Sequence, residues 1–486
     1  MLNGCAKTEN RDDAAFIFII GNEIKNMDLR SSRDKHVWKV FQLFTQSLVE
    51  ESDDLRPILS LAKSIEIEND RVFRFKLKEE AQFHDGKKLS SEDLKFSFLD
   101  AVDVKSRLRP LLAVVDRYET PSSAEFEIHL KKQTPAFLMN AVRYIRVLPK
   151  HLAEKKSFRR FPIGSGKYKF SKKEGRDLIF RAVDKKQIYQ KVIFRTVRSP
   201  TMRFYHLISG KADALLDAPD PILLDEAKKN PRTKVIVSQG KRIHYLGFNL
   251  RKKKWDAKKR NCLKQALDVE SALQGKMKQN YLAHDQLILP QSFFYKQNFK
   301  NSPMHQSTHQ STLPSTPCAP MELSILTSHN ENDLKLLQRI QAQLRKKKIF
   351  VKLQSAEFAS FYSSLKNRNF DLFFFAFSGD KDPDYLFSLL HSSASLDGPN
   401  HAGLSNAKID QLLNSARSEK NEEIRKLLYH EIQQSVLSEN YLIPLWIKQN
   451  SMIVSSRLNL EGKQSYDWKD LLKSTKIKSN VRSSQN

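Results

Sequence analysis

The sequence predicts an α/β protein with more than one domain. A chain of 486 residues exceeds the usual size of a single domain, so we expect two or three packed units. A hydrophobic content of 40% with 10% aromatic residues is sufficient for a packed core. The stretch 322–377 alternates strand patterns with helix patterns, which is typical of α/β architecture.

The first strand is expected at Ala14–Ile20. This apolar run, AAFIFII, has the length of a strand and is bounded by Asp13 and Gly21. No run in the chain reaches the ~18 apolar residues that a membrane-spanning helix requires. A helix pattern follows over Lys39–Glu50.

The stretch Val72–Phe98 contains the most informative pattern of the chain. Apolar and basic residues alternate over 73–78, as in a strand with one buried face. The tripeptide His84-Asp85-Gly86 predicts a turn in which glycine is free to adopt positive φ. Ser90 is expected to cap the next helix, with Asp93 at the capping-box position.

The order and identity of the residues in this stretch resemble a sequence signature of a known family. VFRFKLKEEAQFHDGKKLSSEDLKFSF is similar to a block of the extracytoplasmic solute-binding proteins, family 5, of bacterial oligopeptide, dipeptide and nickel ABC importers. Pro162–Tyr168, Tyr245–Asn249 and Phe370–Tyr385 resemble further blocks of that family. The resemblance covers about residues 14–455, apart from 291–320. It implies a two-lobed periplasmic-binding-protein-like fold of type II, in the large three-domain variant, with mixed sheets and a ligand cleft between the lobes.

The resemblance also suggests domain boundaries. We expect residues 1–13 to form an N-terminal lipid-attachment segment or linker and residues 14–250 to form lobe 1, with an extra α/β subdomain at about 36–160. Lobe 2 is expected at 251–439, and 440–486 would return to lobe 1 and end in a tail. The polar repeat MHQSTHQSTLPSTP predicts a flexible surface insert at about 297–320.

By this resemblance the chain is a binding protein and not an enzyme. It would bind peptides, in particular oligopeptides, in the interlobe cleft and deliver them to the permease and ATPase subunits of an importer. A monomer without cofactor, in the periplasm or at the outer face of the cytoplasmic membrane, is expected. A non-peptide solute such as a nickel chelate is the alternative ligand.

The candidate site lies in Phe370–Tyr385, FDLFFFAFSGDKDPDY. The resemblance assigns Asp380 to the α-ammonium group of the ligand, because a buried ammonium needs a matching carboxylate. Main-chain groups of Ala376 to Ser378 would hold the peptide backbone as an added strand. Phe377 would pack over the ligand or belong to the core, and the other lobe would contribute near Asn249.

Two nearby acids have other expected roles, and one loop bears on the length of the ligand. Asp382 and Asp384 are expected to cap the helix that starts at Pro383. Dipeptide-specific members of the family place an arginine in the loop that corresponds to Thr327–Glu331, where this chain offers only His329 as a cation. Strict dipeptide length is therefore not expected.

The three cysteines are Cys5, Cys262 and Cys318. Their spacing indicates neither a metal site nor a disulfide, and Cys262 is expected to be a buried thiol. The sequence Leu2–Cys5 resembles the end of a lipoprotein signal, which would make Cys5 a lipidated residue and attach the protein to the membrane surface. This requires a basic and then apolar segment encoded upstream, because none precedes Leu2.

Other function classes are less well supported. A net charge of +28 suggests nucleic acid or an anionic surface, but the basic residues are scattered, so a solvated basic surface is the simpler interpretation. The sequence contains neither a G-x-S-x-G nucleophile motif nor H-E-x-x-H, which argues against a hydrolase. No metal site is expected at His305 and His309, and the glycine pair in Pro162–Tyr168 predicts tight backbone packing more than a phosphate site.

Overall fold

The computed structural model divides the chain into two compact units. Unit 1 is Met1–Ser238 with Asn450–Asn486, and unit 2 is Gln239–Gln449. The expected boundaries at 250 and 439 differ from these, because β13 (Arg242–Phe248) and β18 (Leu442–Lys448) pair with each other inside unit 2. The described residues are 14–28, 35–51, 57–102, 112–134, 137–153, 155–217, 221–238, 240–297, 318–380, 382–395, 398–460 and 467–475.

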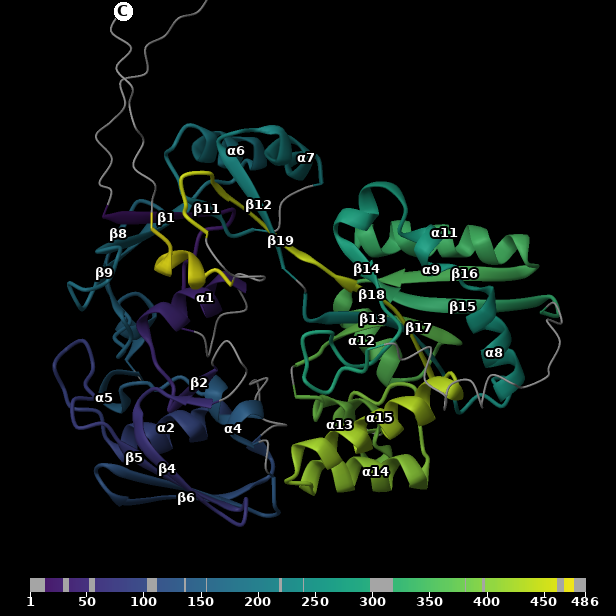
Figure 1. Cartoon of the computed structure of the whole chain (residues 1–486), viewed down its shortest axis with the longest axis horizontal. Helices are drawn as coiled ribbons and strands as arrows, with labels where there is room; N and C mark the ends of the chain where they lie inside the picture. Colours follow the sequence, from purple (N-terminus) through teal and green to yellow (C-terminus); the bar gives the residue numbers. More distant parts are fainter. Residues whose placement is uncertain are drawn as a thin grey trace, which may run out of the picture. The chain divides into compact units, whose positions relative to one another are not determined.

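Unit 1 contains a seven-stranded mixed sheet in the order β12-β19-β11-β1-β10-β9-β8 (Figure 1). Its strands are β1 (Ala15–Ile20), β8 (Tyr168–Glu174), β9 (Asp177–Ala182), β10 (Lys191–Thr196), β11 (Ala214–Leu215), β12 (Thr233–Ser238) and β19 (Asn450–Ser455). β1 runs parallel to both of its neighbours and is buried on both faces, Phe16 and Phe18 in one core cluster and Ile17 in another. This explains the continuous apolar run and confirms the first predicted strand.

A second, four-stranded antiparallel sheet in unit 1 has the order β4-β5-β7-β6. It consists of β4 (Ala62–Glu68), β5 (Val72–Leu77), β6 (Val115–Ser122) and β7 (Glu125–Leu130), and a short pair joins β2 (Val49–Glu51) to β3 (Pro57–Leu59). One face packs Phe73, Phe126 and Ile128 against helix α2 (Ser91–Val102). The alternation in the sequence predicted this face.

The turn and the glycine pair are structural, as predicted. The backbone N–H of His84 donates to the carbonyl of Gly164, and its Nε2 lies 2.9 Å from the carbonyl oxygen of Gly166. A Cβ atom on Gly166 would lie 2.5 Å from the carbonyl carbon of Phe44, so only glycine allows this approach. The capping box forms in part: Asp93 accepts hydrogen bonds from the backbone N–H and the hydroxyl of Ser90.

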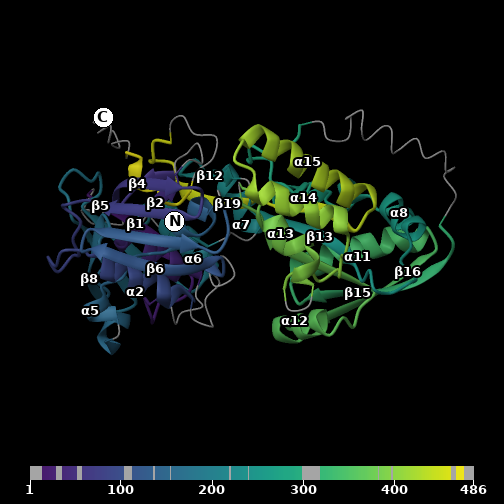
Figure 2. The same cartoon turned by 90° about the horizontal axis from the view of Figure 1, so that it is seen from below.

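Unit 2 is built on a six-stranded mixed sheet in the order β14-β18-β13-β17-β15-β16. The strands are β13 (Arg242–Phe248), β14 (Tyr281–Ala283), β15 (Met321–Ser328), β16 (Ile349–Ala356), β17 (Leu372–Ser378) and β18 (Leu442–Lys448). Helix α11 (Glu331–Lys346) runs along β15 and β16, and its buried leucines join the core of one face (Figure 1). On the other face α14 (Ala407–Ser418) and α15 (Glu422–Ser438) lie side by side, next to α13 (Tyr385–Leu390) (Figure 2).

Shorter elements complete the two units. The remaining α-helices are α1 (Lys35–Phe44), α4 (Phe137–Asn140), α5 (Lys150–Ala153), α6 (Pro200–Ile208), α7 (Pro221–Lys229), α8 (Ala257–Ala266), α9 (Val269–Ala272) and α12 (Phe358–Lys366). The 3-10 helices are η1 (Val142–Tyr144), η2 (Lys156–Arg159), η3 (Gly275–Gln279), η5 (Ser392–Ala394) and η6 (Asp470–Lys473). In the part of the chain that the structure describes, none of the helices has both the length and the apolar character to span a bilayer.

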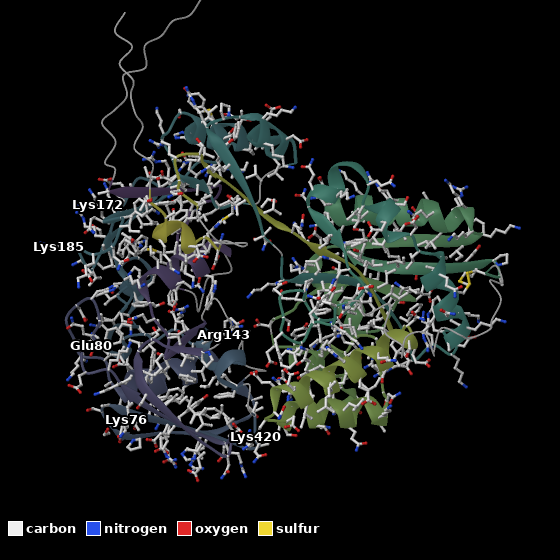
Figure 3. The ribbon with its side chains drawn as sticks, viewed as in Figure 1. Lys76, Glu80, Arg143, Lys172, Lys185 and Lys420 are labelled. Atoms are coloured by element: carbon white, nitrogen blue, oxygen red, sulfur yellow. A yellow bond between two sulfur atoms is a disulfide. The ribbon has the colours of Figure 1, made fainter. Side chains whose placement is uncertain are left out.

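The expectation of a buried thiol at Cys262 is wrong, because this residue forms a disulfide that the spacing did not indicate. Cys262 on α8 and Cys318, just before β15, are bonded, with their Cα atoms 5.7 Å apart (Figure 3). A separation of 56 residues along the chain gave no spacing signal, because such a pair is brought together only by the packing of α8 against the sheet. The predicted insert at 297–320 falls mostly outside the described residues, as does Cys5.

Several basic side chains project into solvent, although Arg146, Arg260 and Arg425 are buried. Lys76 and Lys172 point outward, and both side chains are more than half exposed (Figure 3). This arrangement fits a solvated basic surface.

Candidate ligand-binding site

The candidate site is centred on β17, whose two edges differ. Toward β13, the N–H of Gly379 donates to the carbonyl of Lys241 (2.7 Å), and the N–H of Asn249 donates to the carbonyl of Asp371 (3.0 Å). Along β17, the odd-numbered residues therefore direct their peptide groups to β13. The even-numbered residues direct theirs to the opposite edge.

That opposite edge is only partly paired. The ladder between β15 and β17 contains only Ile325↔Leu372 and Leu326↔Phe373, whereas β15 pairs with β16 on its other side over its whole length. Within the described residues, no strand pairs with Ala376 or Ser378 on this side. The peptide N–H and C=O groups of these two residues thus form an open sheet edge, of the kind to which an extended peptide can add as a further strand.

Phe377 lies next to this edge and belongs partly to the core. Its ring centroid is 5.5 Å from that of Tyr245 and 5.3 Å from that of Tyr385. The side chain is half-buried, so packing fixes its orientation while part of the ring stays accessible. Both of the roles considered for Phe377 are compatible with this position.

Asp380 follows the open edge by two residues. Its side chain is 19% exposed, and one carboxylate oxygen lies 4.0 Å from Nζ of Lys241. The lysine side chain is about half exposed (47%) and is long enough to move aside. A cation at Asp380 is therefore already accommodated in this structure, and a ligand ammonium group would have to replace Lys241.

The acids that follow are held by arginines. Nη1 and Nη2 of Arg425 donate to the carboxylate of Asp382 at 2.5 and 2.9 Å, and Arg417 binds Asp384 in the same two-pronged way at 2.8 and 2.9 Å. Burial alone would lower the pKa of Arg425, but the contact with Asp382 outweighs burial and raises this pKa, so the guanidinium group is charged. Both pairs fix the loop beyond Asp380.

The expected capping role is wrong for Asp384 and incomplete for Asp382. Asp384 occupies the N-cap position of α13 but makes no side-chain capping hydrogen bond, because its oxygens bind Arg417. Asp382 accepts from the N–H of Asp384 in addition to Arg425. Arg417 on α14 and Arg425 on α15 were not predicted as partners of these acids, because only tertiary packing brings the helices to this loop.

Asn249 lies away from the other candidates. It follows the last residue of β13, opposite Asp371, whereas Ser378 and Asp380 lie at the other end of the strand pair. Its buried amide donates to the carbonyls of Arg368 and Phe370 at 3.0 and 3.2 Å. It belongs to unit 2, in contrast to the expectation of a contribution from the other lobe, because β13 pairs with β17. We therefore leave Asn249 out of the site.

A buried histidine, His244, lies near the same end of the sheet, with the charged residues Arg242 and Lys448 close by. His244 pairs with Ala376 in register, and its ring stacks on Phe374 and Trp446. Burial, together with the charges of Arg242 and Lys448, lowers the pKa of His244 to about 3, so the imidazole is neutral. The backbone N–H of His329 donates to the carbonyl of Ala356, and Nδ1 of its exposed ring lies 3.3 Å from the Ser355 hydroxyl oxygen.

Comparison with known proteins identifies the family. Residues 56–397 match the profile of bacterial extracellular solute-binding proteins, family 5, middle part. The chain belongs to this family. The profile covers more than half of the chain, including the Val72–Phe98 block and β17.

Relatives of family 5 share the fold over nearly their whole length. The chain is 25% identical over 463 residues to the oligopeptide-binding protein AppA of Bacillus subtilis, covering 87% of this chain and 84% of the relative. The solved structure of that AppA, in complex with a nonapeptide, superimposes with a TM-score of 0.71 at 22% identity, covering 95% and 98%. NikZ of Campylobacter jejuni, in complex with Ni(L-His), gives 0.71 at 24%, covering 93% and 96%.

Membership in family 5 makes this an extracellular solute-binding protein of the ABC-importer type. Proteins of this kind bind a solute and hand it to a permease with its ATPase, and the relatives found are binding proteins and not enzymes. The predicted resemblance and fold class are thus confirmed.

Proposed function

We propose that this family 5 protein binds oligopeptides for import, with the ligand backbone on the open edge of β17 and the ligand ammonium group at Asp380. The observation behind the proposal is the unpaired edge at Ala376 and Ser378, followed at once by a carboxylate. Main-chain hydrogen bonds do not read side chains, so a protein that binds peptides in this way accepts many sequences.

The position of Asp380 supports a role in fixing the peptide register. An ammonium group removed from water needs a carboxylate partner, and the paired acids Asp382 and Asp384 are already neutralised by arginines. Asp380 meets a flexible lysine instead. Exchange of Lys241 for the ligand ammonium keeps the charge balance of the site.

The loop Thr327–Glu331 supports an oligopeptide over a dipeptide. This loop contains no arginine, and its one cationic candidate, His329, lies with Nδ1 3.3 Å from the Ser355 hydroxyl oxygen. Without a fixed cation for the ligand carboxylate at that place, the peptide length is not restricted there. The trapping of the peptide between two lobes stays a prediction of the family resemblance.

The test uses pentapeptide mixtures with free and with acetylated N-termini, measured by calorimetry. We expect acetylation to weaken binding to the natural protein more than tenfold, because it removes the charge that Asp380 pairs with. Asp380→Asn should weaken binding of the free peptides by a similar factor and should make acetylation nearly irrelevant. Glu357→Gln removes an exposed acid of the same unit and should change neither result.

The outcome decides between ligand classes. Equal affinity for free and acetylated peptides would remove Asp380 from the site. Native mass spectrometry of the purified protein separates the alternatives: a co-purified peptide supports the proposal, whereas a nickel chelate such as the Ni(L-His) bound by NikZ refutes it.

We further propose lipid attachment at Cys5, which lies outside the described residues. The proposal rests on the sequence Leu2–Cys5 alone. Mass spectrometry of the mature protein from membranes tests it, since an unmodified Cys5 thiol would contradict it.

A further inference from the structure

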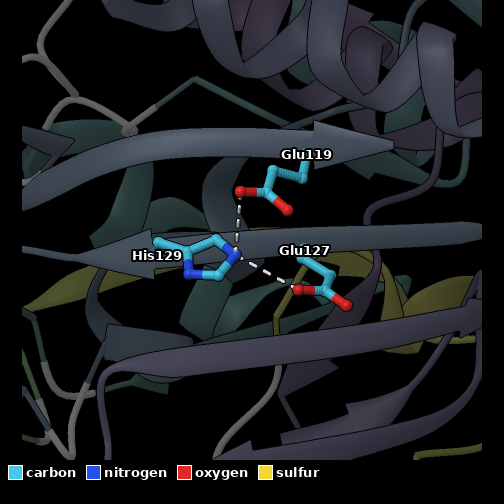
Figure 4. Close-up of side chains that lie close together, drawn as sticks. All are labelled: Glu119, Glu127 and His129. Atoms are coloured by element: carbon cyan, nitrogen blue, oxygen red, sulfur yellow. Dashed lines mark hydrogen bonds and ion pairs between the residues drawn. The ribbon is translucent and has the colours of Figure 1, made fainter. Parts of the chain in front are cut away.

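Three potential metal ligands converge on the four-stranded sheet of unit 1 (Figure 4). Glu119 on β6 lies directly opposite Glu127 on β7, and His129 follows two residues further along β7. The core side of this sheet holds Phe126 and Ile128, so the three side chains lie on its other face. They are partly exposed, the imidazole least (13%) and Glu119 most (44%).

The arrangement sets two like charges side by side. Directly opposed carboxylates on neighbouring strands destabilise a sheet unless a cation lies between them. Here guanidinium groups compensate the two carboxylates, since Arg117 donates to Glu119 and Arg74 donates to Glu127.

The two distances from the imidazole nitrogen to the carboxylate oxygens match those between ligands of a small divalent cation. Nε2 of His129 lies 3.1 Å from Oε2 of Glu127 and 3.6 Å from Oε1 of Glu119. Ligands about 2.0–2.2 Å from a zinc ion are separated by roughly 3.0–3.6 Å in tetrahedral or octahedral geometry. The three donor atoms all lie within 4.8 Å of one another, and they face a common point from two strands.

We propose that Glu119, Glu127 and His129 bind a first-row divalent transition-metal ion, for which Zn²⁺ is the probe. One imidazole with two carboxylates is a donor set that zinc accepts, and solvent can supply the remaining ligands. This site is separate from β17 and independent of the proposed peptide binding.

Two neighbouring arginines, Arg74 and Arg117, influence the affinity of the site for the metal ion. Nε of Arg74 donates to the other oxygen of Glu127, Oε1, at 3.2 Å, and so orients this ligand without blocking it. Nε of Arg117 donates to Oε1 of Glu119 at 2.6 Å, the same atom that faces His129. A metal ion must therefore displace Arg117, which weakens binding in the natural protein.

The experiment is a calorimetric titration of the full chain with ZnCl₂. We expect one saturable binding step that both His129→Ala and Glu119→Gln weaken at least tenfold or abolish. Arg117→Gln should tighten the same step several-fold, because it frees Oε1 of Glu119. Tightening is a result that general disturbance of the sheet would not produce, and circular dichroism confirms that each variant is folded.

The control is His151→Ala. His151 also contacts a carboxylate of unit 1, with Nε2 2.8 Å from Oδ2 of Asp85, but it has no second carboxylate in the cluster. The zinc step should persist in this variant. Absence of the step from the natural protein, its survival in His129→Ala or Glu119→Gln, or its loss in His151→Ala would overturn the proposal.

Discussion

The guanidinium group of Arg425 on α15 binds both carboxylate oxygens of Asp382, five residues after Phe377. The two hydrogen bonds are 2.5 and 2.9 Å long, and the side chains are only 7% and 16% exposed. Together with the pair between Arg417 and Asp384, this contact fixes the loop that follows Asp380. The position of the candidate ligand carboxylate thus depends on two helices that are distant in sequence.

Loss of Arg425 is expected to destabilise unit 2. Arg425→Met keeps much of the side-chain volume but leaves Asp382 charged and buried, which costs about 3–5 kcal/mol. Urea denaturation followed by fluorescence measures the change. Lys408→Met breaks an exposed pair on the neighbouring helix, with Glu431, and should leave the midpoint unchanged. Equal midpoints for both variants would contradict the structural role of Arg425.

A proline at position 376 tests the open edge. Ala376→Pro removes an N–H that points away from β13, so the β13–β17 ladder stays intact while one donor for the ligand is lost. We expect pentapeptide affinity to fall at least tenfold. Ala376→Val adds comparable bulk but keeps the N–H, and it should bind with nearly natural affinity. If both variants bind equally well, the edge does not hold the peptide.

The disulfide is expected to stabilise unit 2 substantially. Cys262 and Cys318 enclose a loop of 56 residues, for which chain entropy gives about 4 kcal/mol. The double variant Cys262→Ser, Cys318→Ser should therefore unfold at clearly lower urea concentration than the oxidised natural protein. Adding a reductant to the natural protein should reproduce this shift and should not affect the variant. Identical midpoints under all conditions would exclude a stabilising bond.

The carboxylate of Asp371 is expected to stabilise the folded protein at neutral pH and to lose this effect in acid. Burial acts to raise the pKa of Asp371, but hydrogen bonds from Lys252, Lys254 and the N–H of Ser324 outweigh it and lower the pKa to about 2. The carboxyl group is protonated more readily in the unfolded chain. Its stabilisation is therefore complete above the ordinary value of 3.8 and is lost as the pH falls toward 2.

Asp371→Asn is the corresponding variant. At pH 7 it should be less stable than the natural protein by about 1–2 kcal/mol, a figure that allows for screening of the half-exposed lysines. Urea midpoints measured between pH 7 and pH 2 should converge in the acid range. A difference that stays constant with pH would show that the carboxylate charge is not the cause.

A methyl group at Gly166 should disturb unit 1. The added Cβ would lie 2.5 Å from the backbone of Phe44, which cannot move without shifting α1, so Gly166→Ala should cost at least 2–3 kcal/mol. In Gly21→Ala the nearest atom, at 2.6 Å, is the guanidinium nitrogen of Arg203, which can move aside. Thermal melting should show a large shift only for Gly166→Ala.

Sequence patterns predicted those strands and turns whose formation depends on residues adjacent in the chain. The apolar run at Ala15–Ile20, the alternation of β5 and the turn at Gly86 all follow from neighbouring side chains and allowed φ values. The family resemblance then supplied the fold class and Asp380. The bond between Cys262 and Cys318 and the arginine partners of Asp382 and Asp384 join residues that only tertiary packing brings together, so no spacing in the chain revealed them.

The place of β19 in unit 1 has a consequence for biosynthesis. This strand lies between β11 and β12 in the seven-stranded sheet, yet it is encoded after the whole of unit 2. Without it, β12 has no partner among the described strands. The growing polypeptide therefore cannot finish its first unit until the ribosome has passed residue 455, which leaves the nascent chain incompletely folded during most of its translation.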